Sequence, residues 1–193
     1  MALMGLPMVM VGASGPTTLL SDTFTDTNGV SLDAHMMDVG AGWTLVAAAV
    51  VEVQSNRAEV QNSNEGIAHA DAGQADVTMT ATINLGTSGT TGLSARLLNQ
   101  QNYWLIGIST SNAFSIFERS GGTYTSRASS APSISAGVDY AMSAVTLGST
   151  ISATLDGGND INYASASFLQ AETDFGLSLR SINDKADTFL VTA

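Results

Sequence analysis

The chain has 193 residues, with 17 acidic and six basic side chains and a formal net charge of −11. This charge argues against the basic surface that nucleic acids and anionic membranes require, so we expect neither nucleic-acid binding nor membrane insertion. The lack of cysteine excludes a disulfide framework, a thiolate metal site and a cysteine nucleophile. A chain of this length buries about 70% of its unfolded surface, which supports the core of one domain.

Residues 1–16 form an apolar, methionine-rich segment. It carries no basic residue and Pro7 interrupts it, so it fits a secretory signal poorly, and its apolar run is far shorter than the roughly 20 residues of a membrane span. The segment either folds back onto its own domain or packs on a neighbouring subunit. We favour the second interpretation, because flexible methionines suit irregular apolar contacts. The expected assembly residues are Met1, Leu3, Met4, Leu6, Met8, Val9, Met10 and Val11.

From residue 17 to residue 193, short segments with a period of two predict a single all-β domain. The clearest strand is Asp76–Asn84, in which apolar residues alternate with Thr78, Thr80 and Thr82. Tyr103–Ile108 is apolar on both faces, which predicts a strand in the middle of a sheet. Ten or more strands of this kind indicate a sandwich of two sheets.

Four clusters of turn-forming residues separate strand-like segments. They are Thr87-Ser88-Gly89, Ser120-Gly121-Gly122, Leu147-Gly148-Ser149 and Asp156-Gly157-Gly158-Asn159.

The order of segments resembles the concanavalin A-like, laminin-G-like jelly-roll family over residues 17–193. The motifs that carry the resemblance are Ser21–Asp26, Leu32–His35, Asp38–Gly40, Gly42–Thr44, Asp76-Val77, Gly92-Leu93 with Arg96, Tyr103, Asp156-Gly157 and Ala186–Val191. The resemblance implies a jelly-roll sandwich of two antiparallel sheets of six or seven strands each, with the first and last segments paired. A variant with this spacing is similar to domains of bacteriophage virion proteins and of secreted bacterial sugar-binding modules.

Related sandwiches often bind calcium where their terminal strands meet, and the resemblance points to Asp22, Asp26, Asn28 and Asp187 as candidate ligands. An Asx turn explains the Asp26–Gly29 segment equally well. We expect no other cofactor. His35 is interpreted as a hydrogen-bond donor that fixes its loop, and His69 as an exposed strand residue.

The sequence contains few residues in patterns that would support catalysis. The glucanases that share this fold carry an E-x-D-x-x-E strand, which is absent here, and Glu52 and Glu59 are seven apart, on opposite faces of a regular strand. No G-x-S-x-G elbow surrounds a serine. The chain is therefore predicted not to be an enzyme, and a secreted bacterial hydrolase is the least favoured alternative.

Sugar binding would require exposed aromatic faces, and the candidate platforms are Trp43, Trp104, Tyr124 and Tyr163. Tyr103 and Trp104 point to opposite faces of one strand, so at most one of them belongs to the core and the other is free for an open, concave sheet.

The leading functional hypothesis is a non-enzymatic phage virion protein, a capsid decoration or tail component that its N-terminal arm anchors. It implies a location on the exterior of the virion, other virion proteins as partners, and a homo-oligomer, with a trimer preferred. The alternative is a glycan-binding module, secreted or part of a virion, with surface polysaccharide as its partner.

Overall fold

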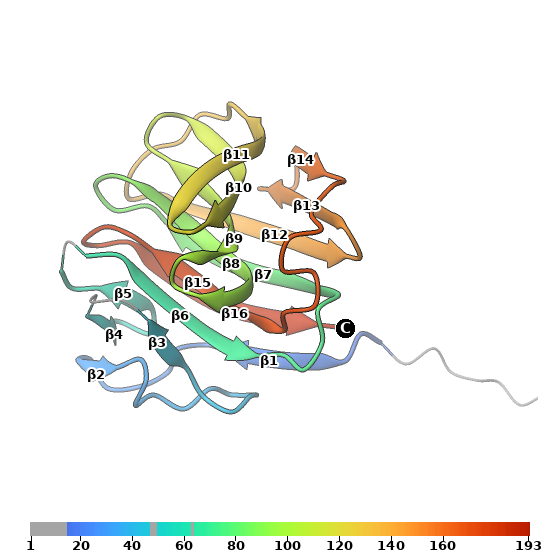
Figure 1. Ribbon diagram of the computed structural model, residues 1–193. Coiled ribbons are helices and arrows are strands. Elements are labelled where there is room, and N and C mark those ends of the chain that lie inside the picture. Colours follow the sequence, from blue (N-terminus) through green and yellow to red (C-terminus); the bar gives the residue numbers. More distant parts are fainter. Residues whose placement is uncertain (1–14, 47–49, 63) are drawn as a thin grey trace, which may run out of the picture.

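The computed structural model describes residues 15–46, 50–62 and 64–193, which form a sandwich of two antiparallel sheets (Figure 1). The predicted all-β jelly-roll architecture is confirmed. The described residues contain no α-helix, and in particular none long and apolar enough to cross a membrane.

One sheet has nine strands. In spatial order they are β14 (Asn159–Tyr163), β13 (Thr150–Leu155), β12 (Asp139–Leu147), β7 (Val77–Asn84), β16 (Lys185–Thr192), β5 (Ala58–Val60), β4 (Val51–Val53) and β2 (Val30–Ser31), and β1 (Thr18–Asp22) also pairs with β16. The pairing of β1 with β16 confirms that the first and last segments of the domain lie side by side.

The other sheet has seven strands. Their order is β11 (Thr123–Ser130), β10 (Ala113–Ser120), β9 (Asn102–Ser109), β8 (Thr90–Asn99), β15 (Asp174–Leu179), β6 (Gly66–Asp71) and β3 (Thr44–Val46). The predicted strand Tyr103–Ile108 is β9, which lies inside this sheet as expected.

The alternating residues of β7 show why the sequence folds in this way. Val77, Met79, Ala81 and Ile83 are buried between the sheets, whereas the three threonines between them face outward and are half-buried. A period of two matches the pleat of a strand with one face on the core. All four predicted turn clusters lie between consecutive strands.

One inference about carboxylates was wrong. Glu52 and Glu59 lie on the two arms of the β4–β5 hairpin, and they pair directly across it. They therefore share a face, because the turn at Gln54–Arg57 reverses the chain between them.

Candidate functional site

The outer face of the seven-stranded sheet carries a second, smaller group of buried side chains. Leu97 and Tyr103, close to the tip of the β8–β9 hairpin, pack with Ile67 of β6 and Leu105 of β9. The hairpin leaves regular pairing between Ala95 and Asn99, and Arg96 there adopts a φ of +49°. Figure 1 shows this hairpin curled rather than flat. The curled hairpin therefore covers part of the outer face.

Glu65, just before β6, is the centre of a hydrogen-bonded network on this face. Its Oε1 accepts from the hydroxyls of Tyr124, at 2.8 Å, and of Tyr103, at 3.2 Å. Its Oε2 accepts from Nη1 of Arg119 at 2.8 Å, and Nε of Arg180 lies 3.0 Å from Oε1. One carboxylate thus holds side chains from four different strands or strand ends.

Two guanidinium groups also pack against Tyr124. The Cζ atoms of Arg119 and Arg180 each lie 4.7 Å from the centroid of its ring. Cation–π contacts of this kind add to the hydrogen bond of the phenol and fix the ring in one orientation.

The surroundings of Glu65 and Tyr124 shift the pKa of each side chain in a different direction. Burial tends to raise the pKa of Glu65, but the hydrogen bond from Tyr124 and the charges of Arg180 and Arg119 outweigh burial and lower it. Burial raises the pKa of Tyr124, and the neighbouring Tyr103 raises it further. Glu65 is therefore an ionised acceptor and Tyr124 a neutral donor at physiological pH.

A pocket of about 150 Å³ opens beside this network. It is lined by Thr90, Leu105, Phe117, Tyr124 and Arg180. The rings of Phe117 and Tyr124 lie edge to face, with centroids 6.1 Å apart. The pocket therefore combines aromatic surface with a hydroxyl and a guanidinium group.

Asp184 positions the backbone at Arg180. Its Oδ2 accepts from the backbone N–H groups of Arg180 and Ser181, each at 2.8 Å, and its Oδ1 accepts from that of Gly86 at 2.7 Å. The carboxylate thereby ties the β15–β16 loop to the β7–β8 loop at one end of the pocket.

Three buried glycines let neighbouring strands of the seven-stranded sheet approach closely. Gly92 of β8 pairs with Gly107 of β9, and Gly176 of β15 pairs with Ser94 of β8. A Cβ at Gly92 would overlap the carbonyl oxygen of Ile106, so a side chain there would force the strands apart. The glycines therefore keep the backbones of β6, β8, β9 and β15 close together.

A second cavity, of about 500 Å³, lies where loops converge near one end of the nine-stranded sheet. Its lining includes Gln54, Arg57, Asn84, Asn183 and Lys185. Arg57 donates from Nη1 and Nη2 to Asp139, both at 2.7 Å, and with Asn84 it lowers the pKa of that carboxyl to about 2. The lining is polar, without an aromatic side chain, and its guanidinium is already paired.

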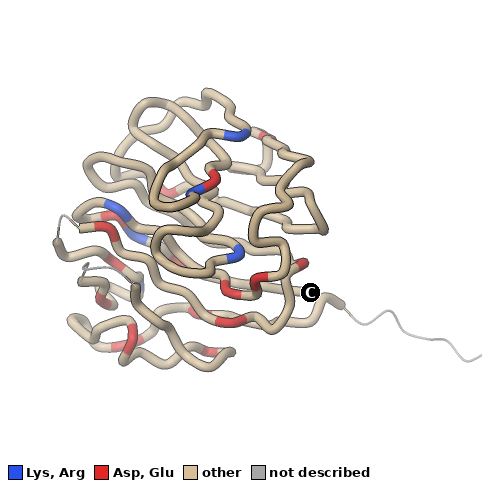
Figure 2. The backbone as a smooth tube through the Cα atoms, in the orientation of Figure 1, with Lys and Arg blue, Asp and Glu red and all other residues tan. Residues whose placement is uncertain are grey.

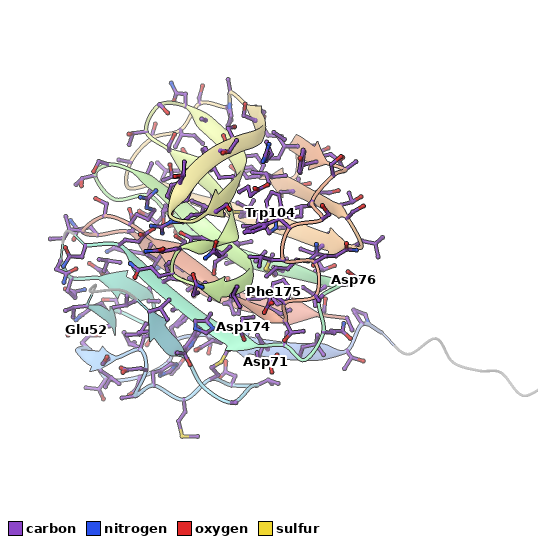
Figure 3. All side chains as sticks on the ribbon, in the orientation of Figure 1. Glu52, Asp71, Asp76, Trp104, Asp174 and Phe175 are labelled. Atoms are coloured by element: carbon purple, nitrogen blue, oxygen red, sulfur yellow. The ribbon has the colours of Figure 1, made fainter. Side chains whose placement is uncertain are left out.

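The structure corrects two of the predicted aromatic platforms. Trp43 is only 4% exposed, and it packs between Phe24 and Phe189. Trp104 (labelled in Figure 3) is fully buried in the core cluster between the sheets, and its Nε1 donates to the carbonyl of Phe168 at 2.8 Å. Neither tryptophan can stack on a sugar at the surface, because each fills the core that joins the sheets.

The two tyrosines of that prediction lie in different places. Tyr124 lines the pocket, whereas Tyr163 of β14 packs 5.8 Å from Trp104, between ring centroids, with Arg127 over its ring. Tyr103 is fully buried beneath the curled hairpin. The expectation that Tyr103 or Trp104 would be free was therefore wrong.

The carboxylates proposed for calcium have other partners. His35 lies between Asp22 and Asp26, with its two ring nitrogens each 3.0 Å from one of them. The side-chain oxygen of Asn28 accepts from the backbone of Ser55, and Asp187 lies 3.7 Å from Arg57. Across the described ranges, no group of three acidic or histidine side chains is arranged to hold a metal.

The two histidines differ in how well the sequence predicted them. His35 is 5% exposed and fixes its loop, as interpreted. His69 was expected to be exposed, but its side chain is only 13% exposed and lies 3.3 Å from Asp174, because the sheet packs around it. The eight assembly residues of the N-terminal arm lie outside the described residues.

Sequence reasoning missed Glu65, Phe117, Arg119 and Arg180. Arg119 pairs with Tyr103 on one side and with Tyr124 on the other, and this register does not follow from the sequence. The available signal was charge, because the chain has only six basic residues and two of them lie here. Figure 2 shows basic positions as few among more widely spread acidic ones.

The sequence matches no known family model and no curated protein. Solved structures do resemble the fold. The carbohydrate-binding module CBM66 from Bacillus subtilis superposes with a TM-score of 0.67 at 15% identity, covering 78% of this chain and 95% of that one. Domain 4 of AbnA, a GH43 extracellular arabinanase from Geobacillus stearothermophilus solved with arabinotriose, gives 0.64 at 9% identity and 93% coverage of both chains.

The GH43 protein BlXynB from Bacillus licheniformis gives a TM-score of 0.63 at 13% identity. The match covers 91% of this chain but only 39% of BlXynB. None of these three structures is described as a virion protein, so they support the predicted jelly roll without its link to phage. At these identities the likeness shows the fold alone, and this chain is a two-sheet jelly-roll β-sandwich.

Proposed function

We propose that this protein is a non-catalytic carbohydrate-binding module that binds sugar in the pocket lined by Thr90, Leu105, Phe117, Tyr124 and Arg180. The observation that carries the proposal is the pairing of two aromatic rings with a guanidinium group in one hollow of the outer face. The C–H face of a sugar ring packs on aromatic surface, while its hydroxyls need donors and acceptors at the rim.

The pocket is formed before any ligand arrives. Tyr124 is held by hydrogen bonds to Glu65 and Tyr103 and by the two flanking guanidinium groups. A fixed ring loses little conformational entropy when a ligand stacks on it, so a small contact area gives more affinity. A volume of about 150 Å³ suits one sugar unit, such as the end of a chain, more than a long oligosaccharide.

The names of similar structures also support a sugar ligand. One of them is described as a carbohydrate-binding module, and another was solved with arabinotriose. The arabinanase that contains the second of these domains is named as extracellular, so we extend the proposal to an extracellular location.

The charges at the pocket favour binding over hydrolysis. A glycosidase needs two carboxyl groups beside the scissile bond, one of them with a raised pKa so that it can donate a proton. In the described part of the chain, no lining residue of this pocket is acidic, and the nearby Glu65 has a lowered pKa. Glu65 is therefore poorly suited to act as a general acid.

Binding to an array of plant, bacterial and animal glycans tests the proposal. Wild-type protein should retain at least one glycan, and Phe117→Ala and Tyr124→Ala should each lose most of the signal. Tyr163→Ala, which alters the other half-buried tyrosine platform, should bind as the wild type does. Loss of binding in Tyr163→Ala alone would move the site to β14, and the absence of binding to any glycan would overturn the function.

A virion protein is the second hypothesis, and it rests on the apolar, methionine-rich sequence of residues 1–16. Because residues 1–14 lie outside the described part of the chain, it depends on an experiment on the arm.

A further inference from the structure

We propose that the sugar bound in this pocket is a sugar acid, a ring that carries a carboxylate, and that Arg180 binds this carboxylate. The inference rests on the proposed function and adds the chemical class of the ligand. Three independent features of the outer face carry it.

The first feature is an excess of hydrogen-bond donors. Glu65 is the charged acceptor shared by the hydroxyls of Tyr103 and Tyr124 and the guanidinium groups of Arg119 and Arg180. The Tyr103 hydroxyl also accepts from Arg119 and lies within hydrogen-bond distance of the hydroxyls of Tyr124 and Ser178. Even with these hydroxyl oxygens counted, the roughly four acceptor positions of the carboxylate leave the network with fewer acceptors than the about twelve N–H and O–H donors of two guanidinium groups and two phenols.

The unpaired donors can be named. Across the described part of the chain, Nε of Arg119 and Nε of Arg180 are both buried without a hydrogen-bond partner, although the second lies 3.0 Å from Oε1 of Glu65. Arg180 makes its side-chain ion pair through Nε, and among the described residues its terminal nitrogens have no recorded partner. Because Arg180 lines the pocket and its side chain is 30% exposed, these terminal nitrogens are available to a ligand.

The second feature is local positive charge in an acidic protein. The network contains two arginines and one glutamate, for a local charge of +1, although the whole chain carries −11. Asp71 and Asp174 pair with each other at the ends of β6 and β15 that lie away from Glu65 and Arg180 (Figure 3). Six residues of strand separate Glu65 from Asp71, or about 20 Å. That distance exceeds the Debye length of about 8 Å at physiological salt, so the distant pair hardly opposes an anion at the pocket.

The third feature is the fixed orientation of the Arg180 guanidinium. Its Nε lies 3.0 Å from Oε1 of Glu65 in an ion pair without hydrogen-bond geometry, its Cζ lies 4.7 Å from the centroid of the Tyr124 ring, and Asp184 accepts from its backbone N–H. A planar guanidinium held in this way presents two parallel donors, which match the two oxygens of a carboxylate. The phenol of Tyr124 already donates to Glu65, so Arg180 is the strongest remaining donor at the pocket.

These features provide separate contacts for the ring and for the carboxylate of a sugar acid. The ring packs against Phe117 and Tyr124, and its carboxylate meets the terminal nitrogens of Arg180. A neutral sugar would make the same ring contacts but would leave the guanidinium without a charged acceptor. A sulfate ester would also supply an anion that a guanidinium group can bind, but it is bulkier than a carboxylate and fits a pocket of about 150 Å³ less well.

NMR titration of ¹⁵N-labelled full-length protein, with the arginine Nε–H signals included, tests the inference. The ligands are methyl glycosides of glucuronate, galacturonate and mannuronate, the neutral hexose that corresponds to each, and the 6-sulfates of those hexoses. We expect at least one uronate to bind tenfold or more tightly than its neutral partner and more tightly than its sulfate. The preference should shrink between 0.05 and 0.5 M salt.

Arg180→Gln should remove the preference for the acid, because it should lower affinity for the uronate more than affinity for the neutral sugar. Arg127→Gln is the matched control, because Arg127 lies on the same sheet, is 33% exposed and pairs with one glutamate at 2.9 Å. It should keep the preference. If Arg180→Gln does not fold, as judged by near-UV circular dichroism, Arg180→Lys keeps the charge, removes the fork and should lower the preference at least threefold.

The outcomes separate the two proposals. Neutral sugars that bind as tightly as their acids would overturn the sugar-acid inference and leave the carbohydrate-binding function intact. A sulfate that binds more tightly than the uronate would overturn the carboxylate assignment. If none of these sugars, and no glycan on the array, shifts a signal of the pocket, both proposals are wrong.

Discussion

The Nε2 atom of His35 lies 3.0 Å from Oδ1 of Asp22, in a buried corner of the sandwich. The other ring nitrogen, Nδ1, lies 3.0 Å from Oδ2 of Asp26. A neutral imidazole donates from only one nitrogen, so a ring between two carboxylates is favoured in its protonated form. Asp22 also accepts from the indole N–H of Trp43 at 2.5 Å, which joins this corner to the core.

Stability should therefore fall as pH rises above about 6.5. Burial tends to lower the pKa of His35, but the hydrogen bonds to Asp26 and Asp22 outweigh burial and raise it above its ordinary value near 6.5. The protonated ring stabilises the fold fully below pH 6.5, and this contribution is lost as pH rises through the raised pKa. Urea unfolding between pH 5.5 and 9 should show the decline, and His35→Gln should remove it.

His69 provides the internal control, because its titration has the opposite sign. Burial lowers the pKa of His69 despite the charge of Asp174, so its contribution is lost as pH falls below about 6.5. His69→Gln should flatten the acid side of the profile and leave unchanged the decline above about pH 6.5. A His35→Gln variant that retained the decline above about pH 6.5 would contradict the account of this corner.

Replacing Glu65 with glutamine should destabilise the protein by about 3 kcal/mol, because the change leaves two partly buried guanidinium groups without their shared carboxylate. Guanidinium chloride unfolding measures the loss. The Glu65→Gln substitution should also release the ring of Tyr124 from its fixed orientation, a change that near-UV circular dichroism detects.

Glu118→Gln is the matched change. Glu118 is as buried as Glu65, at 17% against 16% side-chain exposure, but within the described ranges its one ion-pair partner is Arg127, which is 33% exposed. The expected cost is about 0.5 kcal/mol. Equal costs for the two variants would show that the network around Glu65 adds nothing beyond one ordinary ion pair.

Alanine at Gly92 or Gly176 should be strongly destabilising. In each case the new Cβ would overlap backbone atoms of the adjacent strand, so the sheet must open by shifting its strands. Overpacking of this kind costs about 1 to 3 kcal/mol, or more where only backbone can move. Gly158→Ala is the control, because a Cβ there meets nothing within 4 Å. Thermal unfolding should rank Gly158→Ala close to the wild type, and a similar melting temperature for all three variants would contradict the close approach of the strands.

Removal of residues 1–16 should leave the cooperative melting of the sandwich unchanged. The described edge contacts begin at Thr17, whose carbonyl accepts from Ala193, and the described core begins at Leu20. If the arm is an assembly device, light scattering should show a defined oligomer for the full chain and a monomer for the truncated one. Monomers in both cases would remove the basis of the virion hypothesis.

The sequence predicted those parts of the structure that depend on local patterns. Alternation along β7 and glycine-rich turns are local, so the strands and their sheet faces followed from them. The pocket could not be predicted, because it depends on the register that places Arg119 between Tyr103 and Tyr124. It also depends on the hairpin that bends at Arg96, a residue type that rarely adopts a positive φ. The two tryptophans were misjudged because an aromatic residue on a strand does not reveal which face is covered.

The position of the sugar site is the most direct test of the account. Backbone amide signals of ¹⁵N-labelled protein should be followed during titration with whichever glycan the array identifies. The account predicts that the largest shifts come from Thr90, Phe117, Tyr124 and Arg180, at the outer face of the seven-stranded sheet. Shifts confined to Gln54, Asn84 and Asn183, which line the polar cavity of about 500 Å³ near one end of the nine-stranded sheet, would contradict it.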